Sequence, residues 1–167
     1  MIVHRPLPYE KRKWYGLALR HLRMARRLLQ SGFVDGAVFH IYHGYECVLS
    51  AMIAANGYAV PPEGLTTIKS PAGKSVRFYP SPSGRIQELS AHKARLVFFS
   101  QLADNTKPYF VTHGSLSRFL STDLRNDALY YDVGRDRLPH EAYSRSLASG
   151  LFPRVHQFAR QVWRDIR

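Results

Sequence analysis

The amino-acid sequence predicts an all-α protein, an antiparallel four- to five-helix bundle with a long Pro/Gly-rich basic loop at about 58–85. Three observations support this fold class. Two long segments near the N-terminus place apolar residues at three- and four-residue steps, as one face of a helix requires. Segments of the same kind follow the loop, and the other connections are short. The chain has 167 residues, of which 45% are hydrophobic, so we expect residues 1–167 to form a single domain with its own core.

The first two helices have clear ends. The first is predicted over Glu10 to Ser31, where Ser31-Gly32 stops the apolar pattern. The second is predicted over Val34 to Ala55 and ends at Asn56-Gly57, a pair suited to a left-handed cap. Because the connection between these helices is short, they should pair as an antiparallel hairpin.

The rest of the chain is less regular. Prolines and glycines interrupt any helix in the 58–85 loop, although Ser75 to Tyr79 has the composition of a short strand. A third helix is predicted from about Ile86 to Asp104, and a shorter helical piece from Ser115 to Leu124. The last helix follows Pro139, a residue that is tolerated in a first turn.

The net charge indicates a polyanionic partner. The chain has 24 Lys+Arg against 12 Asp+Glu, a formal charge of +12 with a pI of about 10.2. A field of this sign concentrates nucleic acid at the surface, although a basic pI that only aids solubility is the alternative. The candidate phosphate-binding residues on the first helix and in the loop are Arg20, Arg23, Arg26, Arg27, Lys69, Lys74, Arg77 and Arg85.

The sequence argues against a membrane protein. The longest apolar region, Phe33 to Ala55, carries Asp35, His40, His43 and Glu46, each costly in lipid. The chain has one cysteine, Cys47, which cannot form an intrachain disulfide and suits a reducing compartment. We therefore expect a cytoplasmic protein without a membrane partner.

Two stretches carry a family resemblance. The helical hairpin contains the spaced pattern Ala25, Leu28, Leu29, Gly32, Ala37, His40, Tyr42, His43, Glu46, Leu49 and Ala51. An arginine followed by a polar residue, Arg125-Asn126, lies near the last helix. With these features the chain resembles the HEPN family (higher eukaryotes and prokaryotes nucleotide-binding), and the resemblance extends over nearly the whole chain.

The resemblance implies a composite site. In ribonuclease members of the family, an arginine, a polar residue and a later histidine form a motif. Two copies of it meet across a homodimer interface and cleave RNA without a metal. Arg125 and Asn126 match the first half of this motif, but Tyr130 stands at the histidine position. Tyrosine, with a pKa near 10, is a poor base at neutral pH but still donates a hydrogen bond to phosphate.

Two other interpretations of the arginines stay open. Arg135 and His140 have the full spacing of the motif, although Pro139 directly before the histidine constrains the backbone. Alternatively, Arg125 forms a purely structural ion pair with a nearby acid such as Asp127. If Arg125 belongs to the motif, Glu46 and His43 of the second helix are candidates for supporting residues that orient it.

The sequence contains no pattern that specifies a cofactor. His40, His43 and Glu46 have helical spacing that metal ligands also show, but no second ligand cluster accompanies them. We expect these polar residues to bond to each other or to line a dimer cleft, and assign no metal and no cofactor.

Three functional hypotheses follow. The first is an RNA-directed HEPN-like protein, a metal-independent endoribonuclease or toxin component with a degenerate motif. The second is a non-catalytic HEPN-like module that binds RNA, a nucleotide or a nucleotidyltransferase antitoxin partner. The third is a helical interaction protein whose charge is incidental.

Overall fold

The computed structural model describes residues 10–56, 66–69, 75–80, 86–89, 95–96, 99–100, 102–129 and 138–167. Within these ranges the elements, in chain order, are α1 (Glu10–Gln30), α2 (Val34–Ala55), β1 (Thr66–Lys69), β2 (Ser75–Pro80), β3 (Ile86–Leu89), α4 (Pro108–Ser117), α5 (Thr122–Asp127), α6 (Pro139–Ala142) and α7 (Arg145–Ile166). The predicted helical bundle is confirmed.

The α1–α2 hairpin forms as predicted. Gly32, in the turn between the helices, has a φ of 84°, a left-handed conformation that glycine adopts without a Cβ penalty. The turn is closed by the Phe33 N–H, which donates to the Leu28 carbonyl over 2.9 Å. Both helices therefore lie within a residue of their predicted bounds.

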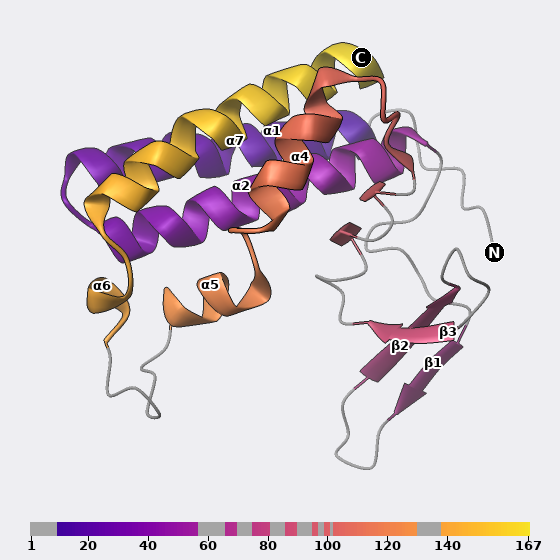
Figure 1. Ribbon diagram of the computed structural model, residues 1–167, viewed down its shortest axis with the longest axis horizontal. Coiled ribbons are helices and arrows are strands. Elements are labelled where there is room, and N and C mark those ends of the chain that lie inside the picture. Colours follow the sequence, from indigo (N-terminus) through magenta and orange to yellow (C-terminus); the bar gives the residue numbers. More distant parts are fainter. Residues whose placement is uncertain are drawn as a thin grey trace.

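The core lies where α7 packs against this hairpin. Figure 1 shows α1, α2 and α7 running side by side along the length of the molecule, with α4 next to them. The last helix, α7, contacts α1, α2 and α4. Most of α2 is buried, because this helix lies against α1, α7 and the short helices α5 and α6. The fully buried large side chains of the core are Leu22, Ile41, Tyr42, Tyr45, Leu49, Met52, Ile53, Phe99, Tyr109, Leu116 and Phe158.

The short helices differ from the prediction. The piece predicted from Ser115 to Leu124 is two helices, because α4 already begins at Pro108 and the side chain of Ser121 caps a new helix, α5. The last helix is also divided. Pro139 begins the four-residue helix α6, and the Ser144 hydroxyl then caps α7 by accepting from the Leu147 N–H over 3.2 Å.

A small sheet replaces part of the predicted loop and part of the predicted third helix. The strands β1, β2 and β3 form an antiparallel sheet in that order, with Thr66 opposite Phe78 and Phe78 opposite Glu88. The strand expected from Ser75 is confirmed as β2. The prediction of a third helix was wrong for residues 86–89, which form β3 and pair with β2. Further along the same segment, residues 95–96, 99–100 and 102 are helical as predicted.

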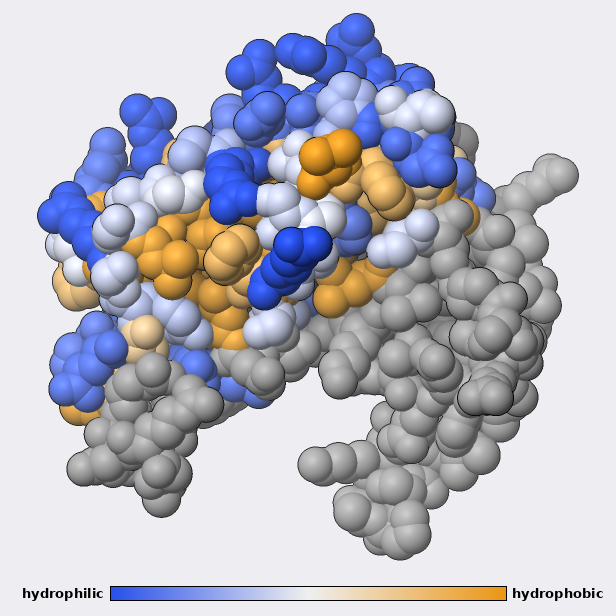
Figure 2. Space-filling model, in the orientation of Figure 1, coloured by the Kyte–Doolittle hydropathy of each residue, from blue (hydrophilic) through white to orange (hydrophobic). Residues whose placement is uncertain are grey.

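Hydrophilic and hydrophobic residues are separated on the face of the molecule seen in Figure 2. Figure 2 shows hydrophilic residues along the upper margin of the view and hydrophobic residues below that margin. Among the helices that the structure describes, none is long and apolar enough to cross a bilayer.

Candidate functional site

α5 positions the predicted arginine motif. This helix begins at the Ser121 cap, whose hydroxyl accepts from the Leu124 N–H over 3.3 Å. Leu124 is 7% exposed and Ala128 is 4% exposed, and α5 contacts α2. The two apolar residues anchor the helix to the core on both sides of Arg125 and Asn126, which are half-buried between them.

Asn126 orients the guanidinium of Arg125. Its side-chain carbonyl oxygen accepts from Nε of Arg125 over 3.3 Å and from Nη2 over 3.0 Å. An amide oxygen is neutral, so this contact restricts the guanidinium without cancelling its charge. Such an oriented cation can bind a phosphate group across the physiological pH range, because an arginine side chain keeps its positive charge.

Tyr143 ties α5 to the start of the last helix, a role that sequence reasoning missed. Its hydroxyl lies 3.2 Å from the Leu124 carbonyl oxygen and 3.3 Å from Oδ2 of Asp127. The contact spans α5 and the α6–α7 junction, and therefore depends on tertiary packing. The sequence signal for it is weak: a tyrosine directly before the serine that caps the last helix.

The structure describes only one of the remaining residues of the two candidate motifs, His140. Tyr130 and Arg135 lie outside the described residues. His140 is exposed in α6, next to Pro139 at the start of that helix. The neighbouring Glu141 carboxylate accepts from the Leu138 N–H over 2.8 Å and fixes this turn. The choice between the 125–130 and 135–140 segments therefore stays a prediction.

Glu46 is the centre of a buried polar cluster. It is 5% exposed, and its carboxylate lies 3.2 Å from Nδ1 of His43 and 3.5 Å from Nη1 of Arg95. The Tyr42 hydroxyl donates to the same carboxylate over 3.3 Å. Within the described part of the chain, Nε of Arg95 is buried without a hydrogen-bond partner. The expected bonding between His43 and Glu46 is confirmed, whereas Arg95 was missed and the orientation of Arg125 by Glu46 stays a prediction.

Three histidines gather where α1 faces α2. Nδ1 of His21 and Nδ1 of His40 are 2.9 Å apart, so one ring donates and the other accepts. The rings of His21 and His43 are 5.6 Å apart between centroids. Burial, and then the neighbouring His40 and His43, lower the pKa of His21 to about 4, and burial lowers that of His40. Burial therefore favours the neutral form of both rings, and their mutual hydrogen bond requires that at least one Nδ1 carries no proton.

A fourth histidine lies inside the core. His113 of α4 accepts or donates through both ring nitrogens, to the Tyr45 hydroxyl at 2.8 Å and to the Ser100 hydroxyl at 3.2 Å. Burial lowers the pKa of His113 to about 4. Among the residues that the structure describes, no three His, Cys, Asp or Glu side chains are arranged to hold a metal ion.

The predicted basic surface is described only on α1. Arg20, Arg23, Arg26 and Arg27 are all exposed on that helix. The structure describes only the backbone of Lys69 in β1 and of Arg77 in β2, and Lys74 and Arg85 lie outside the described residues.

Comparison with known families identifies the hairpin. Residues 12–69 match the model of the HEPN domain, across α1, α2 and β1. This part of the chain is therefore similar to a HEPN domain. The predicted resemblance to the HEPN family is thereby confirmed for residues 12–69, whereas Arg125 and Asn126 lie outside the matched range. HEPN domains are generally related to nucleotides or RNA. No curated protein and no solved structure matches the chain.

Proposed function

We propose that this HEPN-type protein acts on RNA as a metal-independent endoribonuclease centred on Arg125 and Asn126. One observation carries the proposal: the Arg125 guanidinium is oriented by a neutral amide oxygen, on a short helix anchored to the HEPN hairpin. The charge of +12 adds the long-range attraction that brings RNA to the surface. A single buried thiol, Cys47, is consistent with work in a reducing cytoplasm.

The chemistry assigns a limited role to each residue. The 2′-hydroxyl oxygen of RNA attacks the adjacent phosphorus, the bond to the 5′-oxygen breaks, and that oxygen takes up a proton from solvent, leaving a 2′,3′-cyclic phosphate. Arg125 stabilises the negative charge that develops on the phosphoryl oxygens. Tyr130, at the histidine position of the motif, donates a hydrogen bond to phosphate, while solvent accepts the proton of the 2′-hydroxyl. A second copy of the chain supplies the second arginine across a homodimer interface.

Cleavage of a labelled single-stranded RNA in excess chelator tests this function. We expect Arg125→Ala to lower the rate by a factor of about 10²–10³, as for the loss of one charge-stabilising contact. Asn126→Asp keeps an oxygen beside the guanidinium but neutralises its charge, so it should also slow cleavage. The matched control Asn105→Asp introduces the same charge at an exposed position. His140→Ala should leave the rate unchanged. Loss of cleavage in His140→Ala but not in Arg125→Ala would move the site to the 135–140 segment.

The tyrosine at the histidine position favours a second candidate, a non-catalytic module. Such a protein would bind RNA or a nucleotide, or dock on a nucleotidyltransferase antitoxin partner, through the same arginine. Tyr130→His separates the two candidates. If the wild-type protein does not cleave RNA and Tyr130→His does, the binding module is the correct function and the ribonuclease proposal is wrong.

A further inference from the structure

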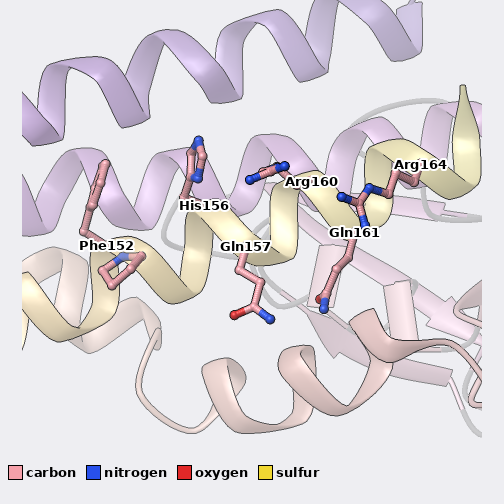
Figure 3. Close-up of a pocket in the computed structure, with 7 residues that line it drawn as sticks. Phe152, His156, Gln157, Arg160, Gln161 and Arg164 are labelled. Carbon is pink, nitrogen blue, oxygen red and sulfur yellow. The ribbon is translucent and has the colours of Figure 1, made fainter.

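The exposed face of α7 is hollowed along much of its length. A cavity of about 440 Å³ is lined by Phe152, His156, Arg160 and Arg164 together with neighbouring side chains of the same helix. Figure 3 shows these side chains projecting from successive turns of α7, with Phe152, His156 and Arg160 on the side of the other long helices. None of the lining residues belongs to α5, which carries Arg125.

Two further cavities continue this hollow on both sides of α7. One, of about 250 Å³, lies between α1 and α7 and shares Phe152 and His156 with the first, adding Arg23 and Arg26. The other, of about 260 Å³, lies towards α4 and shares Arg164. The first two cavities share Phe152 and His156 and form one surface, which we call the α1–α7 groove. Its charged and aromatic residues are Arg23, Arg26, Phe152, His156, Arg160 and Arg164.

The groove holds cations without compensating acids. All four arginines are exposed, and no carboxylate of the described residues lies within ion-pair distance of them. The acidic residue at the α4 end is Asp165, whose carboxylate is 3.0 Å from the Lys107 ammonium group. The charge of the arginines is therefore available to an anionic ligand. Arg160 and Arg164 are four residues apart, or on the order of 6 Å along the helix axis, so they can contact successive phosphates.

The groove also contains a pair of aromatic rings. The rings of Phe152 and His156 are nearly parallel, with an interplanar angle of 18° and 6.2 Å between centroids. His156 is exposed and Phe152 half-buried, so a planar group has access to both. Unpaired bases stack on such rings, whereas the bases of a duplex are already stacked on each other.

We propose that the α1–α7 groove binds single-stranded RNA. Phosphates lie along Arg23, Arg26, Arg160 and Arg164, and a base stacks on Phe152 and His156. This inference rests on the proposed RNA-directed function, and adds to it a substrate-holding surface contributed by the two ends of the chain. Arg154 is not part of the groove, because it bonds to Ser115 and lies over the Phe119 ring.

The test measures fluorescence anisotropy of a labelled 2′-O-methyl oligonucleotide, which cannot be cleaved because its 2′-oxygen is blocked. At about 0.15 M salt, Arg23→Ala/Arg26→Ala and Arg160→Ala/Arg164→Ala should each weaken binding about tenfold or more. Each pair should also reduce the slope of log affinity against log salt by about 1.4, or 0.7 per phosphate contact. The control Arg118→Ala/Arg145→Ala removes two exposed arginines outside the groove and should change affinity less than about threefold.

Phe152→Leu tests the stacking directly, because it keeps apolar volume and charge while removing the ring. We expect about a tenfold loss for the single strand. Thermal unfolding of every variant verifies that it is folded. Equal losses in groove and control pairs, an unchanged affinity in Phe152→Leu, or equally tight binding of a duplex or of polyglutamate would overturn the inference.

The same titrations distinguish this inference from the proposed function. If Arg125→Ala abolishes binding while the groove variants bind normally, RNA is held at α5 alone and the groove proposal fails. If the wild-type protein binds no RNA at any salt concentration, both proposals fail.

Discussion

His113 illustrates at the residue scale how burial sets chemistry. It is 5% exposed, its ring stacks against Tyr45 and contacts Phe99 and Phe158, and its bonding partners are the hydroxyls of Tyr45 and Ser100. None of these neighbours carries a compensating charge at neutral pH. The core therefore accommodates the neutral imidazole and disfavours the imidazolium ion.

The lowered pKa predicts a loss of stability in mild acid. The pKa of His113 is about 4 in the folded protein and 6.5 as the ordinary value, so the unfolded chain binds the proton more tightly. The contribution of neutral His113 to the free energy of unfolding is therefore fully present above pH 6.5 and is lost as the pH falls towards 4. The total loss is about 2–3 kcal/mol. His113→Gln should flatten this part of the curve of unfolding free energy against pH, measured by urea denaturation.

A second histidine limits the size of this effect. His21 contributes in the same direction as His113, so some slope remains in the His113 variant. Parallel curves for wild type and His113→Gln between pH 6.5 and 4 would contradict the assigned cause.

At the scale of elements, the close contact of α1 and α2 depends on a glycine. A Cβ atom added at Gly44 would lie 3.1 Å from the side chain of Leu22 and 3.5 Å from the carbonyl oxygen of Ala18. Both neighbours belong to the buried face of α1. Glycine in a helix interior lowers helix stability, so its presence here is explained by the space it leaves for α1.

Substitution at two glycines tests this explanation. Gly44→Val should destabilise the protein by about 1–3 kcal/mol, because the larger side chain separates the hairpin. Gly16→Ala is the matched control: no atom lies within 4 Å of a Cβ at that position of α1. It should stabilise the helix by roughly 0.5–1 kcal/mol through helix propensity. Urea denaturation measures both, and a neutral Gly44→Val would show that the hairpin adjusts without strain.

On the scale of the whole molecule, the proposed site requires a second copy of the chain. Leu129, two residues after the end of α5, is 40% exposed, and Leu138, directly before α6, is 44% exposed. Exposed apolar side chains just after α5 and just before α6 are suited to a two-fold interface of the kind that the proposed pairing of Arg125 needs.

Light scattering at tens of micromolar should therefore give the mass of a homodimer. Leu129→Arg should shift it to the monomer, because it places a cation in the apolar contact near the axis. Met24→Arg, at a similarly exposed position of α1, should leave the dimer intact. A wild-type protein that is strictly monomeric in this range would count against both the dimer and the paired active centre.

The elements that were predicted correctly are those whose physical signal is local. The hairpin was predicted almost to the residue, because apolar spacing, Gly32 and Asn56 act within a few positions of each other. The prediction was wrong at Ile86–Leu89. A short apolar segment of this kind is compatible with a helix or a strand, and here its pairing with β2 makes it a strand. The prediction also missed Arg95 and Tyr143, whose partners are distant in the chain.

The sequence by itself determined the helical fold class and the basic charge, since these depend on residue types and short spacings, and it supplies Arg125, Asn126 and Tyr130 as a predicted motif. Only the tertiary structure decided which charges share a surface. Arg23 and Arg26 belong to α1 and Arg160 and Arg164 to α7. They line adjoining cavities because burying the apolar faces of α1 and α7 sets the two helices side by side. Packing of this kind depends on the whole core, and no local pattern specifies it.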